Sequence, residues 1–578
     1  MIHLSGKIWI PLALFLMASQ APARPKNHKG GNRVKIASLS FVPEKWNKEK
    51  NLERIEAMSR EAVKEGAELI ITPEGALEGY LINVVRDAGK KREKLEHKFR
   101  EIAETTEGPG VSRVRDLAGE LNVDIVLGFL EREGPYLYNA CIWIDHQGKI
   151  LHTHRKTHMA QPYFDPPNYR PGHEIKAFDT DLGRVGMLIC YERQVPEVCT
   201  ALAVDGATLL INPSYGSRGE WNDMMLRTRA RDNQCHFIFT HPQQTLVIGP
   251  DGEILLNKED QEGVFFFELK GLGEKSGKLA KRRPEAFSER LSTHVQGGNQ
   301  RLSDPGHIKV AAVQLAVSDH LQQNTQRICD HLEALSRKGV RVALFPECAT
   351  TGYFSEKIPN HTEKDLKEAE KTIAQACSDN DLYAIVGTPY FVDGVRYNMA
   401  LVINPGGNTI YKQAKIQLVG GDTGWAKAGN SLSVFRIDDI TCSLIICHDS
   451  RYPELVRLPV LKGARLVFYL SCESDLAQEH KIEPYRAQVV ARAVENGVYV
   501  IQANAPQVLK PWMGSHGQSR IVSPHGQLLQ EAPIFGETVL IEELDMNEAG
   551  AGNALKSRRA PFLRDYWDLG IEKIGEVE

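Results

Sequence analysis

Two cysteines stand at the ends of apolar runs in the same local pattern. The first is Cys190 in GMLICYERQVPE (186–197), and the second is Cys447 in SLIICHDSRYPE (443–454). In both stretches an acid follows two residues after the cysteine, Pro follows after six, Glu after seven and Gly-Ala after sixteen. Agreement at so many fixed offsets indicates an internal duplication. A thiol becomes a strong nucleophile once a base removes its proton, so the duplicated cysteine is a candidate for covalent catalysis.

A glutamate and a lysine recur in matched contexts upstream of each cysteine. They are Glu74 in TPEG and Lys156 in HRKTH in the first copy, and Glu347 in FPEC and Lys415 in AKIQL in the second. The lysine precedes the cysteine by 34 residues in one copy and by 32 in the other. A carboxylate can take the thiol proton and return it to a leaving amine, and an ammonium can stabilise the oxyanion of an acyl-transfer step.

With these residues in place, both copies resemble the nitrilase superfamily of carbon–nitrogen hydrolases over nearly the whole mature chain. The resemblance rests on three motifs taken together: the PEG/PEC glutamate turn, the lysine strand and the Cys-x-[Glu/Asp]…Pro-Glu turn. It implies two tandem αββα-sandwich domains, each with a Glu–Lys–Cys triad. The backbone N–H after each nucleophile, at Tyr191 or His448, is then expected to help bind the oxyanion.

Four further residues are candidates for positioning the substrate. The resemblance implies a second glutamate between lysine and cysteine, but the loop after each lysine holds one acid only, Asp165 in the first copy and Asp422 in the second. We expect either aspartate to substitute with a shorter reach. Arg193 and Arg451 follow the two cysteines by three and four residues. Each arginine either braces the turn or binds a carboxylate of the substrate.

The segment HTHRKTH brings three histidines close to Lys156, namely His152, His154 and His158. Period-two spacing on a strand would place all of them on one face, an arrangement that metal sites also use. An ammonium among the histidines would repel a cation, and the second copy, TIYKQAKIQL, has no histidine. We therefore expect no metal and no cofactor.

The duplication extends to the elements that must position these residues. RVKIASLSF (33–41) matches HIKVAAVQL (307–315), and each is followed by a stretch with apolar residues at three- and four-residue spacing, which is typical of a helix. A strand into the glutamate turn comes next, ELIITPEGALEGY against VALFPECATTGYF. Alternating helices and strands, with apolar strands such as VDIVLGFL, indicate an α/β fold whose strands are buried on both faces.

The N-terminus has the layout of a secretory signal peptide: Lys7, the apolar run IWIPLALFLMA, and Ala-Pro-Ala for cleavage. The run is too short to span a bilayer, and a buried first helix is the alternative. With no cysteine before Cys141, a lipid-modified N-terminal cysteine is excluded. We expect export, to the periplasm or outside the cell. The expected organisation is a signal peptide (1–23), a flexible N-terminus (24–32), hydrolase domain 1 (33–287), a linker (288–306), and hydrolase domain 2 with a C-terminal extension (307–578).

Length and composition limit the number of domains and the kinds of partner that the chain can have. At 578 residues the chain is too long for one hydrophobic core and suits two or three domains. A hydrophobic content of 42%, a charged content of 25% and a net charge of −4 give no reason to expect a nucleic-acid partner or an anionic membrane surface. The ten cysteines form no CxxC motif, and most stand singly in apolar runs, as small core residues do. Whether any of them pair as disulfides stays open.

The expected reaction is that of an amidase: an amide or N-carbamoyl substrate gives an acid plus ammonia or an amine. A nitrile hydrolase, an amide acyltransferase with the same triad, and a non-catalytic binding protein are the alternatives. In the resemblance, nitrile enzymes often carry Trp after the nucleophile, so Tyr191 and His448 favour amides. Because each half keeps its Glu, Lys and Cys, we expect both sites to be competent. The difference between NPSYGS (212–217) and YLSCES (469–474) predicts that they prefer different small-molecule substrates. We also expect the halves to pack as a pseudo-dimer, with further homo-oligomers left open.

Overall fold

The computed structural model describes residues 33–160, 169–273, 306–473, 482–506, 508–510, 513–557 and 574–576. The expected signal peptide (1–23), the N-terminus (24–32), nearly all of the linker and Asp165 lie outside these residues. Within the described ranges, no helix has the length and apolar character needed to cross a membrane.

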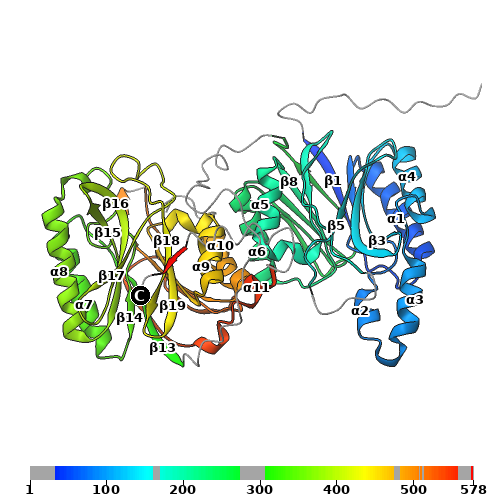
Figure 1. Ribbon diagram of the computed structural model, residues 1–578. Coiled ribbons are helices and arrows are strands. Elements are labelled where there is room, and N and C mark those ends of the chain that lie inside the picture. The colour runs from blue at the N-terminus through cyan, green and yellow to red at the C-terminus, as the bar shows by residue number, and fades with distance from the viewer. Residues whose placement is uncertain are drawn as a thin grey trace, which may run out of the picture.

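The first half is a sandwich of two six-stranded sheets with helices on its outer faces (Figure 1). The strand orders are β12-β1-β2-β3-β4-β5 and β11-β10-β9-β8-β7-β6. The elements are β1 Val34–Ser40, α1 Lys48–Lys64, β2 Leu69–Ile71, α2 Ile82–Arg86, η1 Gly89–Lys91, α3 Arg92–Ile102, α4 Pro109–Leu121, β3 Asp124–Glu133, β4 Tyr136–Ile144, β5 Ile150–Arg155, β6 Phe178–Thr180, β7 Gly183–Met187, η2 Cys190–Gln194, α5 Pro196–Val204, β8 Leu209–Pro213, α6 Glu220–Asn233, β9 His236–His241, β10 Gln244–Ile248, β11 Ile254–Glu259 and β12 Gly263–Leu269.

The alternation of side chains along a strand explains the layers. On β1, Ile36 packs into the core between the two sheets, whereas Ala37 and Leu39 pack against Leu52 and Ile55 of α1. Both faces of the strand are apolar because both are covered. The central strands pair in parallel: β1 with β2 and β2 with β3 in one sheet, and β7 with β8 and β8 with β9 in the other. Parallel strands buried on both faces are the arrangement that the apolar runs predict.

The second half repeats this sandwich, with strand orders β17-β16-β15-β14-β13-β26 and β25-β24-β21-β20-β19-β18-β27. The expected fold, α/β with two tandem αββα sandwiches, is therefore confirmed. The elements are β13 His307–Gln314, α7 Leu321–Ser336, β14 Val342–Leu344, η5 Ile358–Asn360, α8 Glu363–Asn380, β15 Tyr383–Val392, β16 Val395–Ile403, β17 Thr409–Ala414, β18 Leu432–Ile437, β19 Ile440–Ile446, η6 Cys447–Arg451, α9 Glu454–Lys462, β20 Leu466–Ser471, α10 Ile482–Asn496, β21 Tyr499–Asn504, β22 Val508–Lys510, β23 Met513–Gly514, β24 Arg520–Val522, β25 Leu528–Glu531, β26 Thr538–Asp545, η8 Met546–Glu548, α11 Gly552–Ser557 and β27 Ile574–Glu576.

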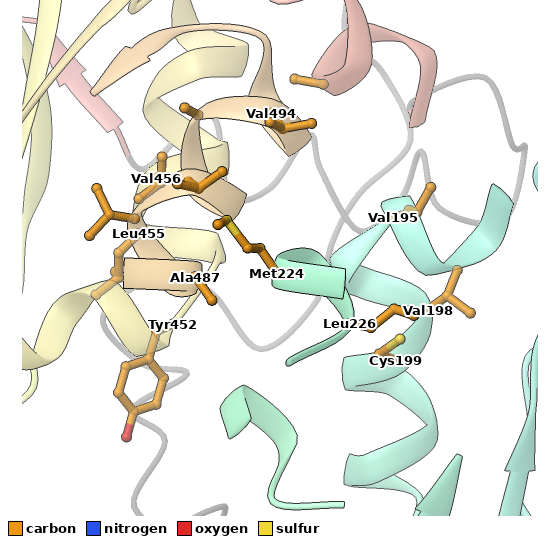
Figure 2. Packing of buried hydrophobic residues seen from close by; sticks show 14 of the residues in the cluster. Val195, Val198, Cys199, Met224, Leu226, Tyr452, Leu455, Val456, Ala487 and Val494 are labelled. Carbon is orange, nitrogen blue, oxygen red and sulfur yellow. The ribbon is translucent and has the colours of Figure 1, made fainter. Parts of the chain in front are cut away.

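The two halves pack against each other through α5 and α6 of the first and α9 and α10 of the second, in the middle of the molecule (Figure 1). One hydrophobic cluster contains residues of all four helices, and Figure 2 shows Met224 of α6 reaching toward Ala487 of α10. An ion pair crosses the same interface, since Arg457 Nε lies 3.0 Å from Glu197 Oε1. The helices α5 and α9 directly follow Cys190–Gln194 and Cys447–Arg451, so the contact joins the segments next to the two candidate nucleophiles.

Candidate active site

The two candidate nucleophiles sit in identical backbone turns. Cys190 and Cys447 each open a short 3₁₀ helix, and their φ angles of +47° and +46° lie in the left-handed region. The α-helices follow these turns, α5 from Pro196 and α9 from Glu454. A left-handed conformation at a residue other than glycine costs of order 1–3 kcal/mol and is concentrated at functional sites. Both halves keep this strain.

The acid two residues after each cysteine ties the nucleophile turn to the loop that follows the lysine. Glu192 accepts hydrogen bonds from the backbone N–H of Ile189 at 2.6 Å and of Thr157 at 2.8 Å. Asp449 accepts one from the backbone N–H of Gln417 at 2.7 Å. The hydrogen bonds of Glu192 and Asp449 therefore explain the acid at this position of the motif by its support of the turn rather than by a catalytic role.

The electrostatic surroundings of these two acids differ. Burial raises the pKa of Asp449 to about 7, although backbone N–H groups oppose the rise. Burial acts on Glu192 in the same way, but His154 at 2.8 Å and Thr157 outweigh it and lower the pKa of Glu192 to about 2. The first half therefore keeps a charged carboxylate where the second holds a carboxyl that titrates near neutral pH.

The three histidines near Lys156 do not converge. His154 contacts Glu192, His152 stacks on Phe178 with ring centroids 4.5 Å apart, and His158 pairs through Nδ1 with the hydroxyl of Thr157 at 2.8 Å. In the part of the chain that the structure describes, no group of three or more His, Cys, Asp or Glu side chains is arranged to hold a metal ion. All ten cysteines lie in that part, and each is a free thiol.

The glutamate and the lysine of each half meet in a buried ion pair. The Nζ atom of Lys156 lies 2.7 Å from Oε1 of Glu74, and that of Lys415 lies 2.7 Å from Oε1 of Glu347. All four side chains are at most 3% exposed. Glu74 and Glu347 follow β2 and β14, and the lysines follow β5 and β17, so strand ends of one sheet bring each pair together.

A matched glycine on the neighbouring strand lets each glutamate turn lie close to the sheet. A Cβ atom added to Gly128 on β3 would lie 2.4 Å from the carbonyl oxygen of Pro73, and one added to Gly387 on β15 would lie 2.3 Å from that of Pro346. No side chain fits in such a space. The two glycines therefore fix the approach of the turn that carries the glutamate.

Sequence reasoning missed one asparagine in each site. The Nδ2 atom of Asn139 donates to Glu74 at 2.7 Å, and that of Asn398 donates to Glu347 at 2.8 Å. The duplication could have identified both asparagines, because Tyr-Asn stands at the third and fourth positions of the matched strands YLYNACIWI and VRYNMALVI. These amides hold the carboxylate oxygen that also faces the lysine.

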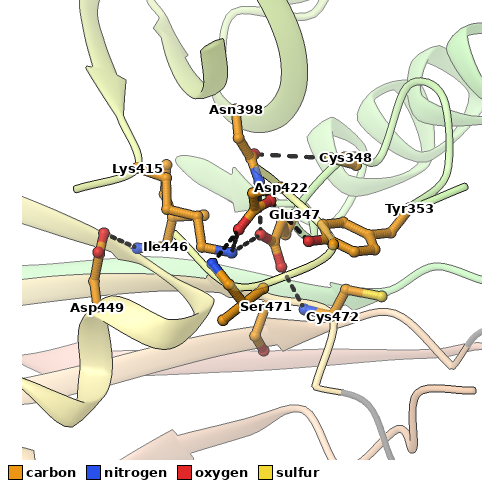
Figure 3. A network of polar contacts seen from close by, with 12 residues as sticks. Glu347, Cys348, Tyr353, Asn398, Lys415, Asp422, Ile446, Asp449, Ser471 and Cys472 are labelled. Atoms are coloured by element: carbon orange, nitrogen blue, oxygen red, sulfur yellow. Dashed lines mark hydrogen bonds and ion pairs between the residues drawn. The ribbon is translucent and has the colours of Figure 1, made fainter. Parts of the chain in front are cut away.

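Asp422 belongs to the second site. Its carboxylate lies 2.8 Å from the Nζ atom of Lys415, accepts a hydrogen bond from the hydroxyl of Tyr353 at 2.7 Å and accepts another from Asn398 at 3.0 Å (Figure 3). Asp165, its expected counterpart in the first half, lies outside the described residues. The lysine of the second site is thus held between two carboxylates.

Burial and charge set the protonation states of the second site. Burial raises the pKa of Glu347, and Lys415 offsets part of the rise. Burial alone would lower the pKa of Lys415, but Glu347 and the other anions raise it well above its usual value, so it stays an ammonium. Burial, followed by the charge of Glu347, raises the pKa of the Cys447 thiol well above its usual value. Cys447 is therefore a thiol at rest, and it would become a nucleophile only after a base takes its proton.

Each site opens into its own cavity, of about 260 Å³ in the first half and about 420 Å³ in the second. Both volumes suit small molecules rather than polymers. The predicted site residues that line the cavities are Lys156, Cys190, Tyr191 and Arg193 in the first, and Glu347, Cys447, His448 and Arg451 in the second.

The two arginines next to the nucleophiles are used differently. Arg193 donates to Asn222 Oδ1 at 2.5 Å, to the carbonyl of Ser217 at 2.6 Å and to Sγ of Cys190 at 3.5 Å, so it braces the turn. The guanidinium of Arg451 makes no hydrogen bond or ion pair with any residue that the structure describes. Arg451 therefore remains available to a ligand.

Comparison with known proteins gives one family. The family model described as carbon-nitrogen hydrolase matches residues 35–271 and 309–553. Omega-amidase NIT2 of Xenopus tropicalis is 29% identical over 248 residues, which are 41% of this chain and 88% of the relative. The bifunctional nitrilase/nitrile hydratase NIT4B of Nicotiana tabacum is 31% identical over 180 residues, 30% of this chain and 51% of the relative. The solved structure of Saccharomyces cerevisiae Nit3, a member of branch 10 of the nitrilase superfamily, is 24% identical with a TM-score of 0.36, covering 41% of this chain and 90% of that one.

Proposed function

Because the chain belongs to the carbon–nitrogen hydrolase family, whose model matches both of its halves, we propose that each half is an amidase-type hydrolase. The observation that carries the proposal is the buried lysine–glutamate pair at 2.7 Å in both halves, next to a cavity that the cysteine lines. The substrates are small amides or N-carbamoyl amines. The name of the NIT2 relative, an omega-amidase, supports an amide over a nitrile.

In the first step the cysteine attacks the amide carbonyl carbon while its proton passes to the glutamate, Glu74 or Glu347. The carbonyl oxygen becomes an oxyanion, which the lysine ammonium and the backbone N–H of Tyr191 or His448 stabilise. The tetrahedral intermediate then collapses to a thioester. The carbon–nitrogen bond breaks, and the glutamate returns its proton to the departing ammonia or amine.

In the second step water attacks the thioester carbonyl, and the same glutamate takes a proton from that water. The carbon–sulfur bond breaks, the acid leaves, and the proton returns to the cysteine sulfur. The raised pKa of Glu347 suits a group that must accept a proton and release it again near neutral pH. Asp422 keeps Lys415 oriented in the second half.

The test is ammonia release from small amides, carbamoyl amines and nitriles by the full chain, by Cys190→Ser and Cys447→Ser, and by the double variant. Serine keeps the size of the side chain, but its hydroxyl is far less acidic than a thiol. We expect each single variant to lose one group of substrates and the double variant to lose all of them. Unchanged ammonia release by the double variant would contradict the mechanism, and no ammonia from any compound would favour a binding protein.

Export of the protein is a separate proposal. The N-terminal pattern supports cleavage near Arg24, which N-terminal sequencing of the exported protein would test. Recovery of a chain that still begins at Met1 outside the cytoplasm would contradict it.

A further inference from the structure

Glu473 is a buried carboxylate beside the second nucleophile, and the mechanism does not use it. It lies two residues beyond the end of β20, is 2% exposed and lines the same cavity as Cys447. Its Oε1 atom accepts a hydrogen bond from the hydroxyl of Tyr469. Its Oε2 atom has no hydrogen-bond donor among the described residues.

The charged and titratable neighbours of Glu473 leave this oxygen without a partner. His516 Nε2 is 3.5 Å from Oε2, but burial lowers the pKa of His516, so the ring is neutral at pH 7 and brings no positive charge to the carboxylate. Neither ring nitrogen makes a hydrogen bond with a described residue. Arg520 adds positive charge to this region without donating to Glu473: its Nε atom pairs with Glu531 at 3.1 Å, and its two terminal nitrogens make no hydrogen bond with a described residue. A buried carboxylate oxygen without a donor is costly, so its presence in a ligand cavity requires an explanation.

Arg451 supplies the opposite charge on the wall of the same cavity. It makes no ion pair with Glu473 or with any other described residue, although both line the cavity. The ring of Tyr485 is a third part of this wall, and the guanidinium of Arg231 from the first half lies 4.0 Å from its centroid. One cavity therefore presents a carboxylate, a guanidinium and an aromatic ring that are not used to satisfy one another.

The first half lacks both features at the matched positions. Aligning NPSYGS (212–217) with YLSCES (469–474) places Gly216 opposite Glu473. A Cβ atom on Gly216 would lie 2.8 Å from Sγ of Cys190, so a side chain at this position stands directly beside the nucleophile. The arginine of the first half braces its turn instead of facing the cavity unpaired. Among the described residues, an unpaired guanidinium facing a buried carboxylate across the cavity occurs in the second site and not in the first.

We propose that the second site takes an amide that is also a zwitterion: an amino acid whose side chain ends in a carboxamide. Its ammonium binds Oε2 of Glu473, its carboxylate binds the guanidinium of Arg451, and its carboxamide meets Cys447. Guanidinium groups suit carboxylates, and ammonium groups are stabilised by carboxylates and by aromatic faces. Turnover of such a substrate rests on the proposed function, whereas its binding does not.

A zwitterion also corrects an electrostatic disadvantage of this site. After burial and Glu347, the charge of Glu473 is a further cause that raises the pKa of the Cys447 thiol. An ammonium bound to Glu473 cancels that charge and makes the thiolate easier to form. The correct substrate thereby favours the deprotonated nucleophile.

The experiment uses the full chain with Cys190→Ser and Cys447→Ser, so that binding is measured without hydrolysis. Calorimetry compares glutamine with three near-isosteres: glutaric acid monoamide, which lacks the ammonium, 4-aminobutanamide, which lacks the carboxylate, and butanamide, which lacks both. The asparagine series covers a shorter chain. We expect the zwitterion of at least one series to bind tenfold or more tightly than each of its isosteres.

Substitutions then test which residue binds the ammonium of the ligand and which binds its carboxylate. Glu473→Gln should lower the preference for compounds with an ammonium at least tenfold, and Arg451→Gln should do the same for compounds with a carboxylate. The matched control is Glu368→Gln, because Glu368 is an exposed glutamate on α8 and does not line the cavity. It should leave both preferences unchanged.

Equal binding of all compounds in both series by the chain that carries only Cys190→Ser and Cys447→Ser overturns the inference. This result does not depend on whether a variant at Glu473 folds. Equal losses for all compounds in Glu473→Gln also overturn it, because they would indicate a structural role. Tight binding of the zwitterion with no ammonia release by the chain with both cysteines contradicts only the proposed function.

Discussion

The carboxylate of Asp422 lies 2.8 Å from the ammonium of Lys415, in a loop whose sequence has no glutamate to offer. The family resemblance implies a glutamate beside this lysine. Here the shorter side chain of an aspartate contacts the lysine instead. Among the described residues, Glu74 is the one carboxylate within ion-pair distance of Lys156. Within the described part of the chain, one carboxylate therefore holds Lys156 and two hold Lys415.

Replacing Asp422 by Asn should weaken the second site. The change keeps the size of the side chain but removes a charge that faces Lys415, and a hydrogen bond to a charged group is worth roughly 1.5–3 kcal/mol, about 10–100-fold in rate. We expect kcat/KM of the second site to fall by this factor and that of the first site to stay constant. Steady-state ammonia release measures the second site in a Cys190→Ser background and the first site in a Cys447→Ser background. Asp439→Asn, at an exposed position, is the control, and an equal loss in both variants would contradict the assignment.

Gly128→Ala should disturb the glutamate turn of the first site. The new Cβ atom would stand 2.4 Å from the carbonyl oxygen of Pro73, and such overpacking costs about 1–3 kcal/mol. The free energy of unfolding, from urea titration, should fall by that amount, and first-site turnover should fall with it. Gly119→Ala is the matched control, because Gly119 lies exposed in α4 with its nearest neighbour 3.8 Å away, where alanine favours the helix. Equal stability of the two variants would refute the packing argument.

The buried pair of Glu197 and Arg457 should contribute to the contact between the halves. Glu197→Gln removes the charge that lies 3.0 Å from the guanidinium, and we expect a loss of about 1.5–3 kcal/mol in the free energy of unfolding. Adding Arg457→Met should recover part of that loss, because no buried charge then remains unbalanced at this place. Calorimetric melting of the single and double variants completes the cycle. Strictly additive losses would show that the two residues do not interact.

Glu192 should make the first half sensitive to acid. Its folded pKa of about 2 lies below the ordinary value of 4.5, so its contribution to stability is complete above pH 4.5 and is lost as the pH falls from 4.5 to about 2. The loss amounts to roughly 3 kcal/mol. Hydrogen exchange of the β7 and β8 amides, corrected for intrinsic rates, should follow it. Glu192→Gln should flatten this dependence and exposed Glu65→Gln should not; a flat profile in the unsubstituted protein would contradict the linkage.

The duplication made most of the site predictable from the sequence. Glu74 and Lys156 are 82 residues apart, yet the structure brings them to 2.7 Å, as the matched contexts in both copies suggested. The α/β sandwich followed from apolar strands alternating with amphipathic helices. Each of these inferences depends on local patterns that occur twice and agree.

What the sequence could not supply depends on contacts between distant segments. The unsatisfied oxygen of Glu473 is visible only once Tyr469, His516 and the cavity are in place. The different use of Arg193 and Arg451 depends on Asn222, which reaches only the first of them from α6. Side chains of the same type, at nearly the same offset, therefore acquire different roles from partners that no local motif contains.

The hydrophobic cluster shared by α5, α6, α9 and α10 has a consequence for behaviour in dilute solution. Two separate chains joined by such an interface come apart when their concentration falls below the dissociation constant. Here one half is tethered to the other, so its effective concentration stays on the order of millimolar at any dilution. The two candidate sites are therefore always present in equal numbers, and one molecule suffices to form the pair.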